Sequence, residues 1–179
     1  GYAFLPDKEI NGLTLGGVGN QTIVDYVQVS YANDDSFEWF GGSVNCKHLI
    51  SFRTLDDDFD TDNGYSGKVQ FGISLRDSSI ADISKSEAFE SDNDANGSDR
   101  KTFLQSIGVS PNNPVAIVPV ITSVVFSNMT LVGPKELATS KGNSLFLAGA
   151  QIRRNSEQSI FNSVFLGWGG GSVNGLLID

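Results

Sequence analysis

The sequence predicts an all-β protein, a right-handed parallel β-helix, and three observations lead to this fold class. Short runs rich in β-branched and aromatic residues are separated by clusters of Gly, Asn and Asp, and no run keeps a helical period. A pattern of strand and acidic corner repeats after 22 residues. The corners that join the runs are longer than the tight turns of β-hairpins, so parallel stacking is favoured over antiparallel pairing.

The repeat is clearest in the first half of the chain. The strand at Val27 and the acidic corner at 35–38 recur 22 residues later at Leu49 and 57–60, and a third strand follows at Phe71. A repeat of this length fits one coil of a solenoid, in which each coil buries its apolar face only by stacking on the next. We therefore expect these three strands to pair in parallel and in register in one sheet.

Later coils are less regular. Residues 128–133 resemble residues 162–167 at a spacing of 34, which leaves the intervening segment 134–143 as a loop excursion from one corner. The polar stretch 84–113 is a larger excursion, of the length that is usually functional or mobile in a compact domain. We expect one β-helix domain over residues 1–179, with coils of about 22 residues interrupted by such loops.

Charge and hydropathy narrow the choice of partners. The formal net charge is −9, and no basic patch is present to meet a nucleic-acid backbone, so nucleic acid is not expected as a partner. No apolar run approaches the roughly 18 residues of a membrane span, so no transmembrane segment is expected. A polysaccharide or a cell-surface glycan is the partner class that remains.

Acidic residues are concentrated between Asp34 and Asp62, where eight carboxylates occur within 29 residues. The repeat stacks each acidic corner on the next at about 4.8 Å, a spacing at which carboxylates repel, so one pKa rises or a cation is recruited. If Phe37 and Phe59 point inward, their neighbours face outward, which predicts an exposed acidic face. The residues of that face are Asp35, Glu38, Asp58 and Asp60.

Three interpretations of this acidic face remain open. It is a solvated corner that blocks edge pairing and keeps the protein soluble, a metal site, or a catalytic site. Catalysis would use a paired acid and base for glycoside hydrolysis, or a base and a cation for a lyase reaction. The candidate catalytic residues are Asp35, Glu38, Asp58 and Asp60.

Aromatic side chains offer a second means of holding sugars. Trp39 and Tyr65 are the candidate ligand-binding residues, because rings with a polar tip stack well on carbohydrate. Tyr26, Tyr31 and Trp168 have the same chemistry. Burial in the core is the alternative for each of them.

A calcium loop is predicted in the large excursion. Asp92, Asp94 and Asn96 alternate ahead of a glycine, as at the start of a calcium-binding loop, and Ser98 can add its carbonyl oxygen. The bidentate carboxylate of such loops is missing, and Glu90 would have to replace it. The alternative is a polar surface turn without an ion.

Several segments resemble a family of bacterial surface lipoproteins common in relatives of Bacteroides. The resemblance lies in residues 11–19, 25–42 and 56–68, and again in 90–94 and 167–168. It implies a parallel β-helix of the pectate-lyase-like kind, export, and attachment at the outer-membrane surface or outside the cell. Family members are longer at both ends, which implies that this chain is the core of a longer protein.

The resemblance carries no catalytic residues, so the function expected from the sequence is that of a non-catalytic surface module. Such a module would bind a glycan or be structural. The alternative is a polysaccharide-active enzyme, a glycoside hydrolase or a lyase, that works at the acidic face.

Overall fold

The computed structural model describes residues 10–94, 110, 121–135, 143–168 and 174–179. Every regular element in these ranges is a β-strand. No helix within them has the length and apolar character that a membrane span requires. The strands form two sheets, and every pair of neighbouring strands in them is parallel.

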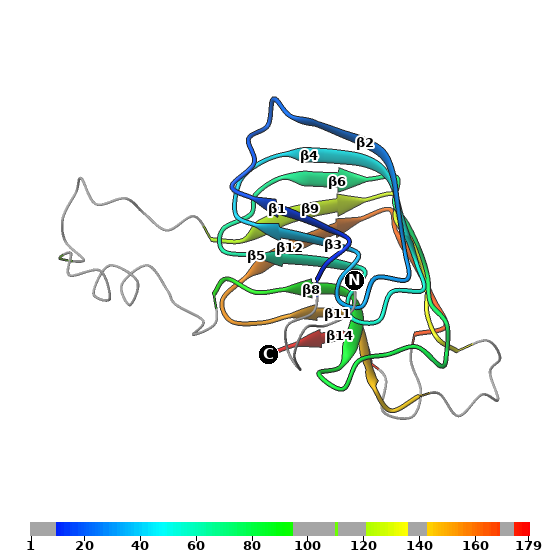
Figure 1. Ribbon diagram of the computed structural model, residues 1–179. Helices are drawn as coiled ribbons and strands as arrows, with labels where there is room; N and C mark the ends of the chain where they lie inside the picture. The colour runs from blue at the N-terminus through cyan, green and yellow to red at the C-terminus, as the bar shows by residue number, and fades with distance from the viewer. Residues whose placement is uncertain (1–9, 95–109, 111–120, 136–142, 169–173) are drawn as a thin grey trace.

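The first sheet, sheet A, contains every strand that opens a new pass of the chain (Figure 1). Its strand order follows the chain order without a crossing. The strands are β1 (Leu13–Gly16), β3 (Phe37–Phe40), β5 (Phe59–Asp62), β8 (Ser86–Ser91), β11 (Phe146–Ile152) and β14 (Asn174–Ile178).

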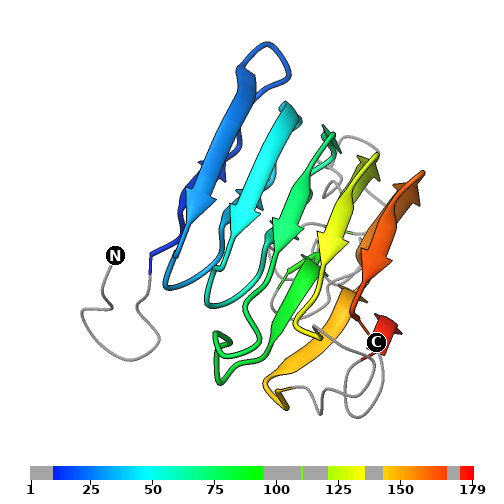
Figure 2. The ribbon, with the colours of Figure 1, turned by 90° about the vertical axis from the view of Figure 1, so that its right-hand side faces the viewer.

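The second sheet, sheet B, takes the chain back after each strand of sheet A, and its strands lie side by side in Figure 2. From the third pass onward each of its strands is split in two by a bend. The strands are β2 (Ile23–Ser30), β4 (Asn45–Phe52), β6 (Lys68–Gln70), β7 (Ile73–Leu75), β9 (Ser123–Ser127), β10 (Thr130–Val132), β12 (Glu157–Phe161) and β13 (Val164–Leu166). We call one pass through both sheets a coil.

The predicted register is confirmed in the early coils. Val27 pairs with Leu49 in sheet B, and Phe37 pairs with Phe59 in sheet A, each across 22 residues. Phe71 belongs to the same sheet, but it lies in the bend between β6 and β7 with a φ of 62°. Parallel stacking is thus confirmed, and the right-handed sense of the winding stays a prediction, in line with the general rule for parallel crossovers.

Aromatic rings fill the space between the two sheets. Phe37 and Phe59 are buried and stack with a centroid distance of 5.5 Å and an interplanar angle of 6°. Phe89 extends the stack at 5.8 Å from Phe59, and Phe126 of sheet B lies 4.0 Å from Phe89. Alternate residues of a strand face opposite sides, so the inward position recurs in each coil and the rings form a ladder.

Trp39 and Tyr65 belong to this core, so the prediction that they present rings to a glycan on the surface is wrong. Both are fully buried, and their rings stack at 5.3 Å. Trp39 lies two residues after Phe37 on the same strand and therefore shares its inward face. The Tyr65 hydroxyl donates a hydrogen bond to the Val44 carbonyl at 2.8 Å, which satisfies its polar tip inside the protein.

Candidate functional site

The outer face of sheet A carries two neighbouring columns of carboxylates, which we call the acidic shelf. The first column consists of Glu38, Asp60 and Glu90, which are register partners on β3, β5 and β8. They follow Phe37, Phe59 and Phe89 directly, so strand alternation turns them away from the core. The second column, one corner earlier, consists of Asp35, Asp57 and Glu87.

The second column is a hydrogen-bond ladder between coils. The backbone N–H of Asp57 donates to Asp35 Oδ1 at 2.8 Å, and that of Glu87 donates to Asp57 Oδ1 at 2.6 Å. Asn11 opens the ladder, since its Oδ1 accepts the N–H of Asp35 at 3.2 Å. The carboxylates thus satisfy backbone donors at the corners, where no sheet partner is available. The recurrence of an Asp-Asp pair after 22 residues was the sequence signal for this ladder.

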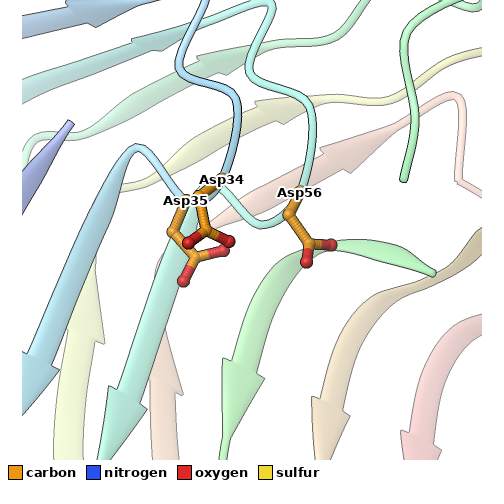
Figure 3. Close-up of side chains that lie close together, drawn as sticks. All are labelled: Asp34, Asp35 and Asp56. Atoms are coloured by element: carbon orange, nitrogen blue, oxygen red, sulfur yellow. The ribbon is translucent and has the colours of Figure 1, made fainter. Parts of the chain in front are cut away.

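Three groups of carboxylates on and beside the shelf bring their oxygens within 4.8 Å of one another. Asp34, Asp35 and Asp56 form one group at two neighbouring corners, where their side chains lie on the same side of the chain (Figure 3). A second group unites Asp35 with Glu38 and Asp60. The third group is Asp57, Glu87 and Glu90.

The shelf is closed to solvent, which contradicts the prediction of an exposed acidic face. Glu38 is 9% exposed and Asp60 is 6% exposed. Burial is the main cause that raises the pKa of Glu38 to about 7, and the charges of Asp62 and Asp34 raise it further, although a hydrogen bond from Asn11 acts in the opposite direction. Burial likewise raises the pKa of Glu90 to about 8.

Asp60 stands at the centre of the shelf. Burial raises its pKa well above the usual range, and the charges of Glu90, Asp35, Asp62 and Glu38 add to the effect. Its Oδ1 atom is closed to solvent and accepts no hydrogen bond from any described residue. A buried carboxylate oxygen without a donor is stabilised by a proton or by a cation. With three carboxylates converging on one point, the arrangement fits a hard divalent cation such as calcium.

Asp58 is not part of the shelf, although the sequence placed it on the same face. It is fully buried, and Oδ2 accepts a hydrogen bond from Arg76 Nε at 2.9 Å, while Ser51 and Ser74 donate to the same carboxylate. The residue precedes β5 and lies in the corner, where the alternation of strand side chains has not yet begun. Its role in this structure is that of a buried ion pair.

The predicted calcium loop is only partly described. Asn96 and Ser98 lie outside the described residues, so the loop itself stays a prediction. Asp92 is engaged elsewhere: Arg153 Nε lies 2.8 Å from its Oδ1, and Arg154 Nη1 lies 2.7 Å from its Oδ2. Arg153 also binds Glu90, with 2.7 Å between Nη2 and Oε2. These two arginines, which the motif could not reveal, already neutralise two of the expected calcium ligands.

Comparison with known families agrees with this architecture. A family model described as a pectate-lyase-like beta helix domain matches residues 1–175. The chain belongs to that family. Searches of curated proteins and of solved structures found no match. A pectate-lyase-like β-helix domain is compatible with a carbohydrate-related role, while the resemblance to surface lipoproteins stays a prediction.

Proposed function

We propose that the chain is a non-catalytic, glycan-binding module that acts outside the bacterial cell or on its outer surface. The burial of the shelf carboxylates carries this proposal. A general acid or base must come within hydrogen-bond distance of the bond that it breaks. Carboxylates as closed as Glu38 and Asp60 have no free access to a polymer. Membership of a pectate-lyase-like β-helix family supports the carbohydrate ligand class.

We further propose that the shelf holds one calcium ion between Asp35, Glu38 and Asp60. The ion would supply the counter-charge that the unpartnered Asp60 oxygen lacks, and it would link the second and third coils through β3 and β5. In this role calcium stabilises the fold and takes no part in a reaction.

A polysaccharide-active enzyme is the second candidate, and one observation favours it. Glu38 has its pKa raised to about 7 beside its register partner Asp60, which is the pattern of a general acid next to a second carboxylate. In this case the shelf would have to open for the polymer to reach it.

Affinity electrophoresis and a reducing-end assay on the same mixtures separate the two functions. Neutral and acidic polysaccharides embedded in native gels should retard the protein, with no reducing ends or unsaturated products released. Turnover that Glu38→Gln and Asp60→Asn abolish would establish the enzyme instead. Glu157→Gln, at an exposed carboxylate on β12, is the matched control and should behave as wild type in both assays. Absence of both retardation and turnover would reject both functions.

A further inference from the structure

A column of stacked rings runs along the outer side of sheet B, at the bend in each strand. Tyr26, His48 and Phe71 occupy this position in three successive coils. The centroids of Tyr26 and His48 lie 4.4 Å apart with an interplanar angle of 11°, and those of His48 and Phe71 lie 5.2 Å apart with an angle of 12°. Tyr26 is 78% exposed and Phe71 is 44% exposed. These rings lie outside the core, and the acidic shelf belongs to the other sheet.

The backbone at this column gives the choice of residues a meaning. Tyr26, His48 and Phe71 all adopt the left-handed conformation, with φ of 55°, 51° and 62°. Asn128 and Asn162 continue the column in the next two coils with φ of 55° and 44°, and the Asn162 amide donates a hydrogen bond to Asn128 Oδ1. Asn tolerates this conformation far better than a bulky side chain does. Three rings at strained positions where Asn would be more comfortable indicate that the rings themselves have a function.

The rings line a groove of about 350 Å³ with an apolar floor. Val27, Ile50 and Ile73 contribute to that floor. Polar groups lie at its side: His48 Nδ1 and Asp25 Oδ1 are 2.6 Å apart, and the amide of Gln28 also lines the groove. A sugar-binding site combines these same elements, namely ring faces or edges for the C–H surface of the sugar and a few polar groups for its hydroxyls.

We propose that this groove is the glycan-binding site and that its ligand is a neutral, β-linked glycan. The inference rests on the proposed glycan-binding function and adds the site and the ligand class. Lys and Arg are absent from the residues that line the groove, and the chain has a net charge of −9, so an anionic glycan is disfavoured. β2 pairs only with β4, which leaves the face of Tyr26 that points away from His48 uncovered by any described strand and open to a sugar ring.

The groove can be tested with substitutions that keep the fold. Tyr26→Asn and Phe71→Asn place at these positions the residue that the same column uses at Asn128 and Asn162, so the melting temperature should stay the same or rise. Tyr31→Asn is the matched control, because Tyr31 is an exposed aromatic residue with a φ of 56° that does not line the groove.

Calorimetric titration with cello-, xylo- and galacturono-oligosaccharides measures the effect. The neutral sugars should bind the wild type and Tyr31→Asn equally, and at least about tenfold more weakly to Tyr26→Asn and Phe71→Asn, which corresponds to about 1.4 kcal/mol. His48 is the only histidine of the chain, so its ring signals in a proton spectrum should shift during the same titration.

The outcomes distinguish the groove from the proposed function. Equal binding by the wild type and both groove variants would overturn the groove and leave glycan binding standing. A preference for galacturono-oligosaccharides would overturn the neutral ligand class. Failure of the wild type to bind any of the sugars, at millimolar concentration, would overturn the groove together with the proposed function.

Discussion

Replacing Phe59 by Ala tests which side chains face the core. Phe59 is fully buried, with the ring of Phe37 at 5.5 Å, that of Phe89 at 5.8 Å and that of Phe126 at 6.2 Å. Truncation of a buried Phe costs about 3–5 kcal/mol, and rigid aromatic neighbours hinder collapse of the cavity, so we expect about 4 kcal/mol. For a chain of this size that corresponds to a fall in melting temperature of roughly 8–16 °C.

Urea unfolding gives the free-energy difference, and a thermal melt gives the shift in melting temperature. The control is Phe161→Ala, which removes the same atoms from an exposed position on β12 and should change stability by about 0.5 kcal/mol or less. A loss below about 1 kcal/mol for Phe59→Ala, or equal losses for the two variants, would refute the placement of Phe59 at the centre of the aromatic ladder.

Three further predictions concern charges. Arg76→Met should cost about 3–5 kcal/mol in chemical unfolding, because Asp58 would stay buried without its partner, and adding Asp58→Asn should recover part of the loss; an unchanged midpoint would contradict the buried pair. Without calcium, stability should fall as the pH rises from about 4 to about 8: burial raises the pKa values of Glu38 and Glu90 to about 7 and about 8, so the folded state holds more protons than the unfolded state in this window. Melts that rise with pH over this window would reject that cause. Asp60→Asn should raise the calcium-free melting temperature at about pH 8 and change it little at about pH 5, because it removes a carboxylate that is charged only at the higher pH; a lower melting temperature at both values would contradict the repulsion.

The early coils could be predicted because their repeat is direct. Val27 with Leu49 and Phe37 with Phe59 keep one spacing and one chemistry, so a single offset gives both partners and the inward face. The later coils offered no such guide. Val69 of β6 pairs with Phe126 of β9, 57 residues further on, and no local pattern reveals a partner beyond so long an excursion.

The acidic shelf was located from the sequence, but its environment was not. Stacking of Glu38 on Asp60 followed from the 22-residue offset, whereas burial depends on what surrounds a side chain in space. Asp58 was placed one residue too early in the alternation, because a corner does not obey the period of a strand. Arg153 binds Asp92 across 61 residues, an ion pair that no spacing rule anticipates.

The sugar-binding groove was hidden for a different reason. Tyr26 was recognised as an aromatic residue suited to sugars, but Trp39 and Tyr65 were preferred, because sequence alone does not show on which side of a bend a ring lies. The left-handed backbone that turns Tyr26, His48 and Phe71 outward leaves no compositional trace when the residue is not Gly or Asn.

Calcium titration of chelator-treated protein, followed by calorimetry at about pH 8, tests most directly whether the closed acidic shelf is a cation site. We expect saturable heat and a higher melting temperature for the wild type and for the control Glu157→Gln, and loss of both in Asp60→Asn. Absence of heat in the wild type would contradict the site. So would heat that persists in Asp60→Asn but disappears in Asp94→Ala, because calcium would then bind at the predicted loop and leave the shelf to its protons.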